Sequence, residues 1–148
     1  MQVAEAGTDQ PVTYFEDLRE GMSAEYRRVV TQRDVELFAQ VSGDDNPLHL
    51  DEDYAKGTVF KGRIAHGLLT ASYISTVIGT RMPGPGCIYV SQTFRFKAPV
   101  RAGDEVVARV VVTELHPEKS RATFRTTCSV GERTVLDGEA LIQVPSRG

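Results

Sequence analysis

Residues 67–80 read GLLTASYISTVIGT, a stretch without a single charged side chain. A helix that is apolar or small on every side is normally buried all round, so this stretch predicts a central helix surrounded by other elements. Gly79 and the run Pro83-Gly84-Pro85-Gly86 end the helical pattern. The uncharged stretch 64–80 is too short and too polar to span a membrane, so no membrane association is expected.

Downstream of this helix, apolar and polar residues alternate with period two in four segments. Such alternation is typical of an antiparallel sheet that packs on one face. Short, turn-like connections at 101–104, 117–119 and 131–132 predict that the four strands form a meander. The apolar positions are Ile88, Val90, Phe94 and Phe96 in the first strand, Val106, Ala108, Val110 and Val112 in the second, Ala122, Phe124, Cys128 and Val130 in the third, and Leu136, Ala140 and Ile142 in the fourth.

Upstream of the uncharged helix, the pattern predicts a strand near residues 24–30 and then a helix. Thr31 is the expected N-cap with Asp34 as its capping partner, and Gly43 fits the end of the helix. Residues 43–50 have loop chemistry, and residues 52–56 suit a short helix. The order of elements predicts an α+β fold in which one antiparallel sheet wraps around one long central helix.

Composition narrows the class of protein. The chain has 148 residues and a net charge of −3, which fits one domain, expected over residues 13–148 after a flexible N-terminal segment 1–12. Because no basic excess is present, nucleic acid is not an expected partner. Two cysteines without CxxC spacing and three histidines predict reduced thiols and no metal site. With no signal-peptide pattern, a cytoplasmic location is expected.

The densest group of chemically capable residues is Ser42-Gly43-Asp44-Asp45-Asn46-Pro47-Leu48-His49. A loop can bring the carboxylate of Asp44 to the imidazole of His49, and such a pair can take a proton from water and deliver one elsewhere. The same residues also suit a simple turn, in which Asp45 or Asn46 bonds its own backbone and His49 is merely exposed.

A second feature is Ala65-His66-Gly67-Leu68, at the start of the uncharged helix. Backbone N–H groups at a helix N-terminus are unpaired and carry partial positive charge, so the Gly67 N–H could stabilise a developing oxyanion. The alternative is that Gly67 serves packing and that His66 is a satisfied, partly buried histidine.

The stretch 38–55, FAQVSGDDNPLHLDEDYA, resembles the signature of the MaoC-like, or type 2, enoyl-CoA hydratases. The shared pattern is an aromatic residue, an aliphatic and a small residue, then Gly-Asp-x-Asn-Pro, an aliphatic residue and His. Residues 60–67 (FKGRIAHG) and the opening 15–18 with Gly21 are similar to family members as well. The resemblance covers nearly the whole chain after residue 13 and implies a hot-dog fold.

The resemblance also implies an activity, the reversible (R)-specific hydration of a trans-2-enoyl thioester to an (R)-3-hydroxyacyl thioester. Asp44 and His49 would be the catalytic pair, with the assignment of each proton transfer left open. Gly67 would supply the backbone donor to the thioester carbonyl. Asn46 would brace the loop or orient the water, and Ser75 matches a polar position near the family's site.

The expected partner is an acyl-CoA or acyl-carrier-protein thioester, with no cofactor, because the CoA thioester is the substrate. A homodimer with pockets near its interface is also implied. Rival functions are a hot-dog thioesterase and a non-catalytic acyl-thioester-binding subunit. Candidates for phosphate contacts, in the absence of a phosphate loop, are Arg63, Lys97, Arg101 and Arg121.

Overall fold

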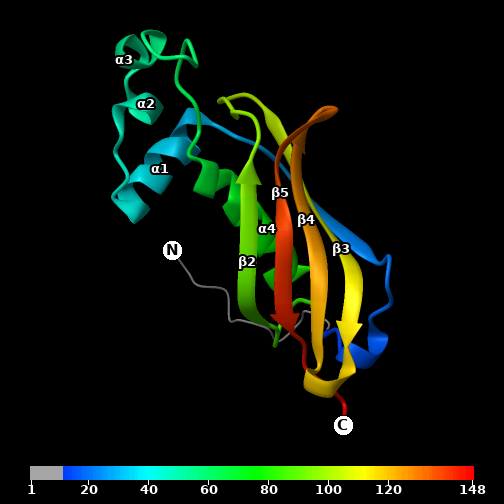
Figure 1. Cartoon of the computed structure of the whole chain (residues 1–148). Helices are drawn as coiled ribbons and strands as arrows, with labels where there is room; N and C mark the ends of the chain where they lie inside the picture. Colours follow the sequence, from blue (N-terminus) through cyan, green and yellow to red (C-terminus); the bar gives the residue numbers. More distant parts are fainter. Residues whose placement is uncertain (1–11) are drawn as a thin grey trace.

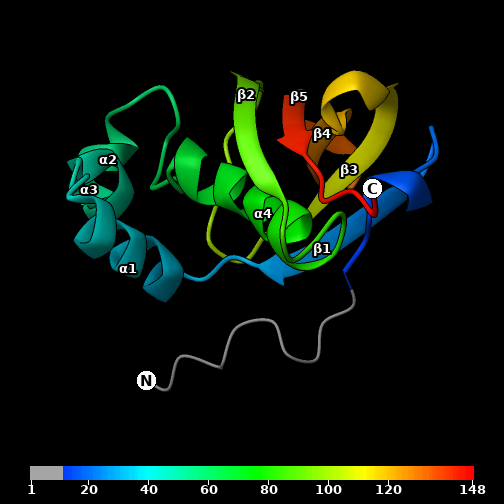
Figure 2. The same cartoon turned by 90° about the horizontal axis from the view of Figure 1, so that it is seen from below.

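One five-stranded antiparallel sheet curves around one long helix (Figures 1 and 2). The structure is a computed structural model that describes residues 12–148, so the predicted flexible segment 1–12 lies outside the described residues apart from Val12. The elements are η1 (Phe15–Asp17), β1 (Ser23–Val29), α1 (Gln32–Ser42), α2 (Pro47–Leu50), α3 (Glu52–Lys56), α4 (Gly67–Thr80), β2 (Ile88–Phe96), β3 (Glu105–His116), η2 (Pro117–Lys119), β4 (Arg121–Val130) and β5 (Arg133–Gln143).

Helix α1 begins and ends where its capping residues predict. The Thr31 side chain accepts a hydrogen bond from the Asp34 N–H at 3.0 Å, and Asp34 accepts one from the Thr31 N–H at 3.1 Å. This reciprocal pair satisfies two of the N–H groups that a helix start leaves unpaired. Gly43 ends the helix with a φ of 81°, a left-handed conformation that favours glycine. The helix therefore enters the following loop at a defined residue.

The strand order is β1-β3-β4-β5-β2, so β3, β4 and β5 form a meander but β2 does not join it beside β3. The predicted four-strand meander is wrong for β2, which lies at the far edge and pairs with β5 (Figure 1). Alternation tells which face a residue takes but not which strand is its neighbour. Gly138 allows the pairing to be close, since a Cβ there would lie 1.7 Å from the Thr93 carbonyl oxygen.

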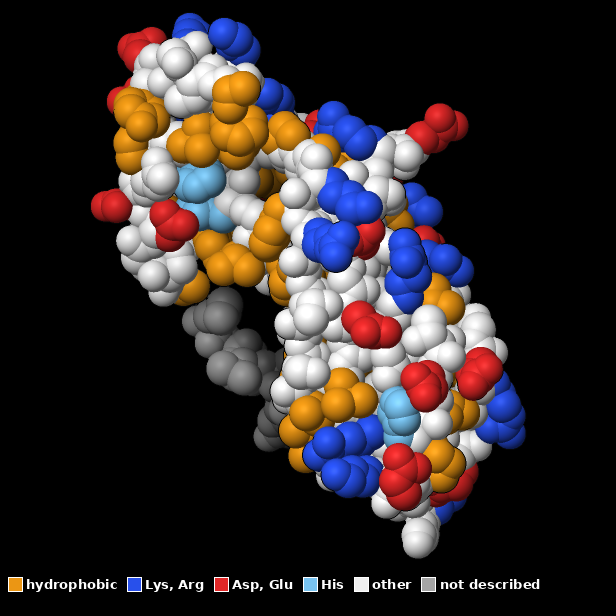
Figure 3. Space-filling view, in the orientation of Figure 1, with side chains coloured by type: hydrophobic (Ala, Val, Ile, Leu, Met, Phe, Trp, Pro, Cys, Tyr) orange, Lys and Arg blue, Asp and Glu red, His pale blue; other side chains and the backbone are white. Residues whose placement is uncertain are grey.

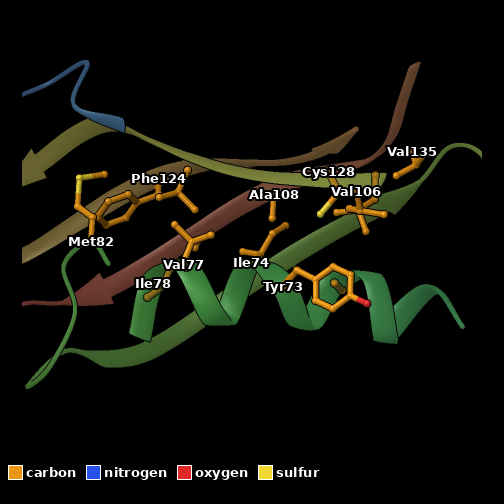
Figure 4. Packing of buried hydrophobic residues seen from close by; sticks show 14 of the residues in the cluster. Tyr73, Ile74, Val77, Ile78, Met82, Val106, Ala108, Phe124, Cys128 and Val135 are labelled. Atoms are coloured by element: carbon orange, nitrogen blue, oxygen red, sulfur yellow. The ribbon is translucent and has the colours of Figure 1, made fainter. Parts of the chain in front are cut away.

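The core lies between α4 and the concave face of the sheet (Figure 4). Ile74, Val77 and Ile78 of α4 are fully buried against strand residues such as Phe124. The predicted burial of the helix on every side is wrong for one face, where Leu68 is 60% exposed. Ser72, Ser75 and Gly79 are exposed too. A single sheet covers only one side of a helix, and the uncovered side carries small and hydroxyl residues.

The apolar positions predicted for β3, β4 and β5 are confirmed as core positions, except that Val130 is only partly buried. In β2, Phe94 is partly buried and packs against the core, whereas Ile88 is 57% and Phe96 55% exposed. This strand is at the edge of the sheet, and a register shift between Tyr89 and Ser91 breaks the period-two pattern at Val90. None of the helices in residues 12–148 has the length and apolar character needed to cross a membrane.

Candidate active site

The loop after α1 ends in a short helical turn, not in the fully irregular loop that the sequence predicts. The Asn46 side chain caps α2 by accepting a hydrogen bond from the Leu48 N–H at 3.0 Å, and Pro47 occupies the first helical position. The backbone N–H of Asn46 in turn lies 3.3 Å from the Asp44 carboxylate. Asn46 therefore braces the segment between Asp44 and His49, one of the two roles predicted for it.

His49 is held with a defined proton arrangement. Its side chain is only 8% exposed, and Nδ1 lies 2.8 Å from the carbonyl oxygen of Ile64. Because a backbone carbonyl can only accept, the ring proton resides on Nδ1. The Nε2 atom of a neutral His49 consequently presents a lone pair, which is the arrangement that a general base requires.

The structure brings Asp44 and His49 together, as predicted, and adds a third residue. A carboxylate oxygen of Asp44 and one ring nitrogen each of His49 and His66 lie within 4.8 Å of one another. Asp44 is exposed while both histidines are buried. This cluster joins the loop before α2, the α2 turn and the residue before α4, so it depends on the tertiary fold.

His66 is the member that the sequence analysis did not assign to the site. Its Nε2 atom lies 2.9 Å from the main-chain oxygen of Asp44, and its ring stacks on His49 with a centroid distance of 3.8 Å. Burial lowers the pKa of His66 from its usual value, and the nearby His49 lowers it further, against the opposing effect of the Asp44 carbonyl. The feature of the sequence that points to His66 is its position immediately before Gly67, the predicted oxyanion donor.

A cavity of about 490 Å³ opens beside this cluster, at the N-terminus of α4. The N–H groups of Gly67 and Leu68 are the first two of the helix, and neither donates a hydrogen bond to another described residue. Figure 3 shows histidine atoms among hydrophobic side chains beside a hollow between the helices and the sheet. The apolar side chains lining the cavity include Phe60, Ile64, Leu68, Phe96, Val100 and Leu136.

Ser75 is not brought to this cavity. It lies on the exposed side of α4 and is absent from the cavity lining. The physical reason is helical geometry, since eight residues separate Ser75 from Gly67 by about 12 Å along the axis and by about 80° around it. A role for Ser75 stays a prediction.

Most of the basic residues suggested for phosphate contacts are engaged within the chain. Arg63 pairs with Glu52 at 3.1 Å, and Lys97, on the cavity lining, pairs with Asp137 at 2.9 Å. Arg101 donates to the carbonyl oxygens of Arg63 and Phe60, which ties the segment before α4 to the β2–β3 connection. The Nε of Arg121 is buried without a partner among the described residues. These contacts indicate mainly structural roles.

Asp44, His49 and His66 are also spaced closely enough to hold a metal ion. Two features of the cluster disfavour such a site. The Nε2 of His66 already donates a hydrogen bond to the Asp44 carbonyl oxygen, and the rings of His49 and His66 are stacked with planes only 28° apart, whereas the ligands of one metal ion approach it from different directions. The arrangement suits proton transfer beside an apolar cavity better than metal coordination.

The chain is similar to known proteins. The family model of the MaoC-like domain matches residues 15–134 of the chain. The chain is 58% identical over 135 residues to the (R)-specific enoyl-CoA hydratase of Rhodospirillum rubrum, covering 91% of this chain and 94% of that protein. It is 54% identical over 136 residues to the 3-hydroxybutyryl-CoA dehydratase of Methylorubrum extorquens, covering 92% and 87%.

Solved structures give the same result. The unliganded R-hydratase PhaJ1 from Pseudomonas aeruginosa superposes with a TM-score of 0.86 at 44% identity, over 92% of this chain and 88% of that one. The (R)-hydratase from Aeromonas caviae involved in PHA biosynthesis gives 0.85 at 40% identity, over 88% and 99%. The predicted hot-dog fold is confirmed, and the chain belongs to the MaoC-like domain family.

Proposed function

We propose that the protein is an (R)-specific enoyl-CoA hydratase, which adds water reversibly to a trans-2-enoyl-CoA to give an (R)-3-hydroxyacyl-CoA. The observation that carries this proposal is the meeting of Asp44 and His49 beside an apolar cavity lined by Gly67, whose N–H donates to no other described residue. The similarity to an (R)-specific enoyl-CoA hydratase and a 3-hydroxybutyryl-CoA dehydratase supports the same substrate class.

The proposed reaction uses each part of the site. A water molecule lies between Asp44 and His49, one of which takes a proton from it while the water oxygen bonds to C3 of the enoyl group. The proton is passed on through the pair to C2, so that both the H and the OH of the water are added and Asp44 and His49 end in the protonation states in which they began. The Gly67 N–H donates to the thioester oxygen, which carries enolate-like negative charge as the reaction proceeds.

The experiment follows the enoyl-thioester absorbance of crotonyl-CoA together with the release of free thiol. A hydratase removes the absorbance without releasing thiol, and chiral separation of the product should give the (R)-3-hydroxy isomer. Thiol release would identify a thioesterase instead. No reaction across a series of enoyl-CoA chain lengths would support a non-catalytic acyl-thioester-binding subunit. The same series, repeated with enoyl-acyl-carrier protein, would identify the preferred chain and carrier.

We also propose that two chains pair through β2, which is an edge strand of the sheet within residues 12–148 and exposes apolar residues. An unpaired edge strand can hydrogen-bond with a second copy. Sedimentation should give twice the 16.3 kDa mass of one chain. Ile88→Lys on β2 should release monomers, whereas Val29→Lys, at a similarly exposed position on the opposite edge strand β1, should not. A fully active wild-type monomer would contradict the proposal.

Two further parts of the proposal concern cofactor and location. We propose that the reaction needs no cofactor, because both proton transfers can be made by the Asp44–His49 pair. Activity that disappears on dialysis against a chelator would contradict this. The two free cysteines, Cys87 and Cys128, support a cytoplasmic location, which fractionation of expressing cells would test.

A further inference from the structure

His66 stands at the N-cap of α4 but does not cap the helix. Its side chain makes no hydrogen bond to the first turn, whereas the residues favoured at this position, such as Ser, Thr or Asp, accept one there. The ring is directed instead to the main-chain oxygen of Asp44, which lies 22 residues earlier in the chain. Among the described residues no group accepts from the N–H groups of Gly67 and Leu68, the first two of α4, so they are available to another acceptor.

The hydrogen bond to Asp44 defines the state of His66. Since the carbonyl can only accept, Nε2 carries the proton. The other ring nitrogen, Nδ1, is buried and has no hydrogen-bond partner among the described residues. With only 2% of the residue exposed, a second proton on Nδ1 would place a buried, unsolvated charge against His49. His66 is thus a neutral imidazole with one committed donor.

His66 also makes ring contacts with two elements. It stacks on His49 of α2 at 3.8 Å, and it meets Phe38 of α1 at 4.8 Å in a tilted arrangement. One side chain therefore touches the backbone of Asp44 and the ring of His49, and it directly precedes Gly67 in the chain. These are the three groups to which the proposed reaction assigns a role.

We propose that His66 is a positioning residue that holds Asp44, His49 and the Gly67 N–H in one fixed geometry. The inference rests on the hydratase function proposed above. It assigns His66 no proton transfer, because its donor is already bonded to a carbonyl and its free nitrogen is shielded from solvent. Loss of the hydrogen bond should allow the loop that carries Asp44 to shift relative to α4, and misplacement of catalytic groups lowers turnover more than substrate binding.

The test compares two variants that each keep one half of the interaction. His66→Phe keeps a ring of similar size against His49 but leaves the Asp44 carbonyl without a donor. We expect its kcat for crotonyl-CoA to fall about tenfold, the effect of one net hydrogen bond, with KM changed by less than about twofold. His66→Gln keeps an N–H donor, and we expect kcat to return to within about threefold of the wild type.

His116→Phe is the matched control. His116 lies at the end of β3 and makes a hydrogen bond of the same 2.9 Å length, to Thr123 Oγ1, outside the site. Its loss should leave kcat and KM unchanged.

The outcomes separate the inference from the proposed function. A wild-type protein that hydrates no enoyl-CoA overturns the function and the inference with it. Hydration by the wild type together with a wild-type kcat in His66→Phe overturns the inference alone, as does a loss confined to KM. Should His66→Phe fail to fold by circular dichroism, a His66→Gln variant that folds but loses tenfold or more in kcat would still contradict the inference.

Discussion

The substitution Gly67→Ala tests the role of the first residue of α4. A Cβ at this position would lie 2.7 Å from Cδ1 and Cε1 of Phe96, whereas ordinary contact begins at 3.4 Å, so the ring must retreat by about 0.7 Å or more. Phe96 is 55% exposed and can swing outward. Alanine is also a better helix former than glycine, by up to about 1 kcal/mol. The variant should therefore fold with an unchanged or slightly higher Tm.

Activity should fall sharply in the same variant. The added methyl group and the ring of Phe96 both lie at the cavity beside the Gly67 N–H, which the proposed reaction assigns to the thioester oxygen. A misplacement of about 1 Å costs on the order of 100-fold, and loss of one oxyanion donor costs about 10²–10³ in kcat. We expect kcat/KM for crotonyl-CoA to drop about 100-fold.

The assay is the initial rate of enoyl absorbance loss, with thermal unfolding followed on the same samples. Gly79→Ala is the matched control, because it adds the same methyl to the same helix where no heavy atom lies within 4 Å. Its rate should equal that of the wild type. A wild-type rate in Gly67→Ala, or an equal loss in Gly79→Ala, would refute the argument that the space in front of Gly67 is needed for the reaction.

Three further predictions concern the catalytic pair, an ion pair and a buried thiol. Asp44→Asn and His49→Ala should each lower kcat by about 10²–10⁴-fold while circular dichroism stays native, and wild-type activity in either would defeat the assignment of the pair. A hydrogen bond from the Arg28 guanidinium is the main reason why the pKa of Asp34 lies below its usual 3.8. The ionised Asp34 therefore stabilises the fold at pH values above 3.8, and this effect is lost as the pH falls through the lowered pKa. Urea unfolding should find Asp34→Asn less stable than the wild type at pH 7, and an undiminished difference at pH 2 would contradict this. Burial raises the pKa of Cys128 to about 12, so in the Cys87→Ser variant a thiol reagent at pH 8 should label it only after urea unfolds the chain, and rapid labelling of the native protein would argue against its burial.

The sequence by itself determined the elements whose signals are local. The Thr31–Asp34 capping pair and Gly43 define both ends of α1, because their hydrogen bonds and φ angle involve residues within one turn. Helix α4 and the core faces of β3, β4 and β5 follow from composition and spacing, since burial of apolar side chains requires those periods. The motif that contains Asp44 and His49 is also local, and it indicates the MaoC-like family without any knowledge of the fold.

Tertiary structure alone decided which of these elements meet. The pairing of β2 with β5 includes a close backbone contact between Thr93 and Gly138, and the open face of α4 follows from having a single sheet to cover it. In the site, a hydrogen bond joins His66 to Asp44 across 22 residues, and the ring of His66 stacks against His49. Alternation and spacing indicate which face of its own helix or strand a residue occupies, but contacts between distant segments arise only when the chain packs. The sequence therefore predicts Asp44 and His49 as catalytic residues, whereas the contacts of His66 with both of them are seen only in the fold.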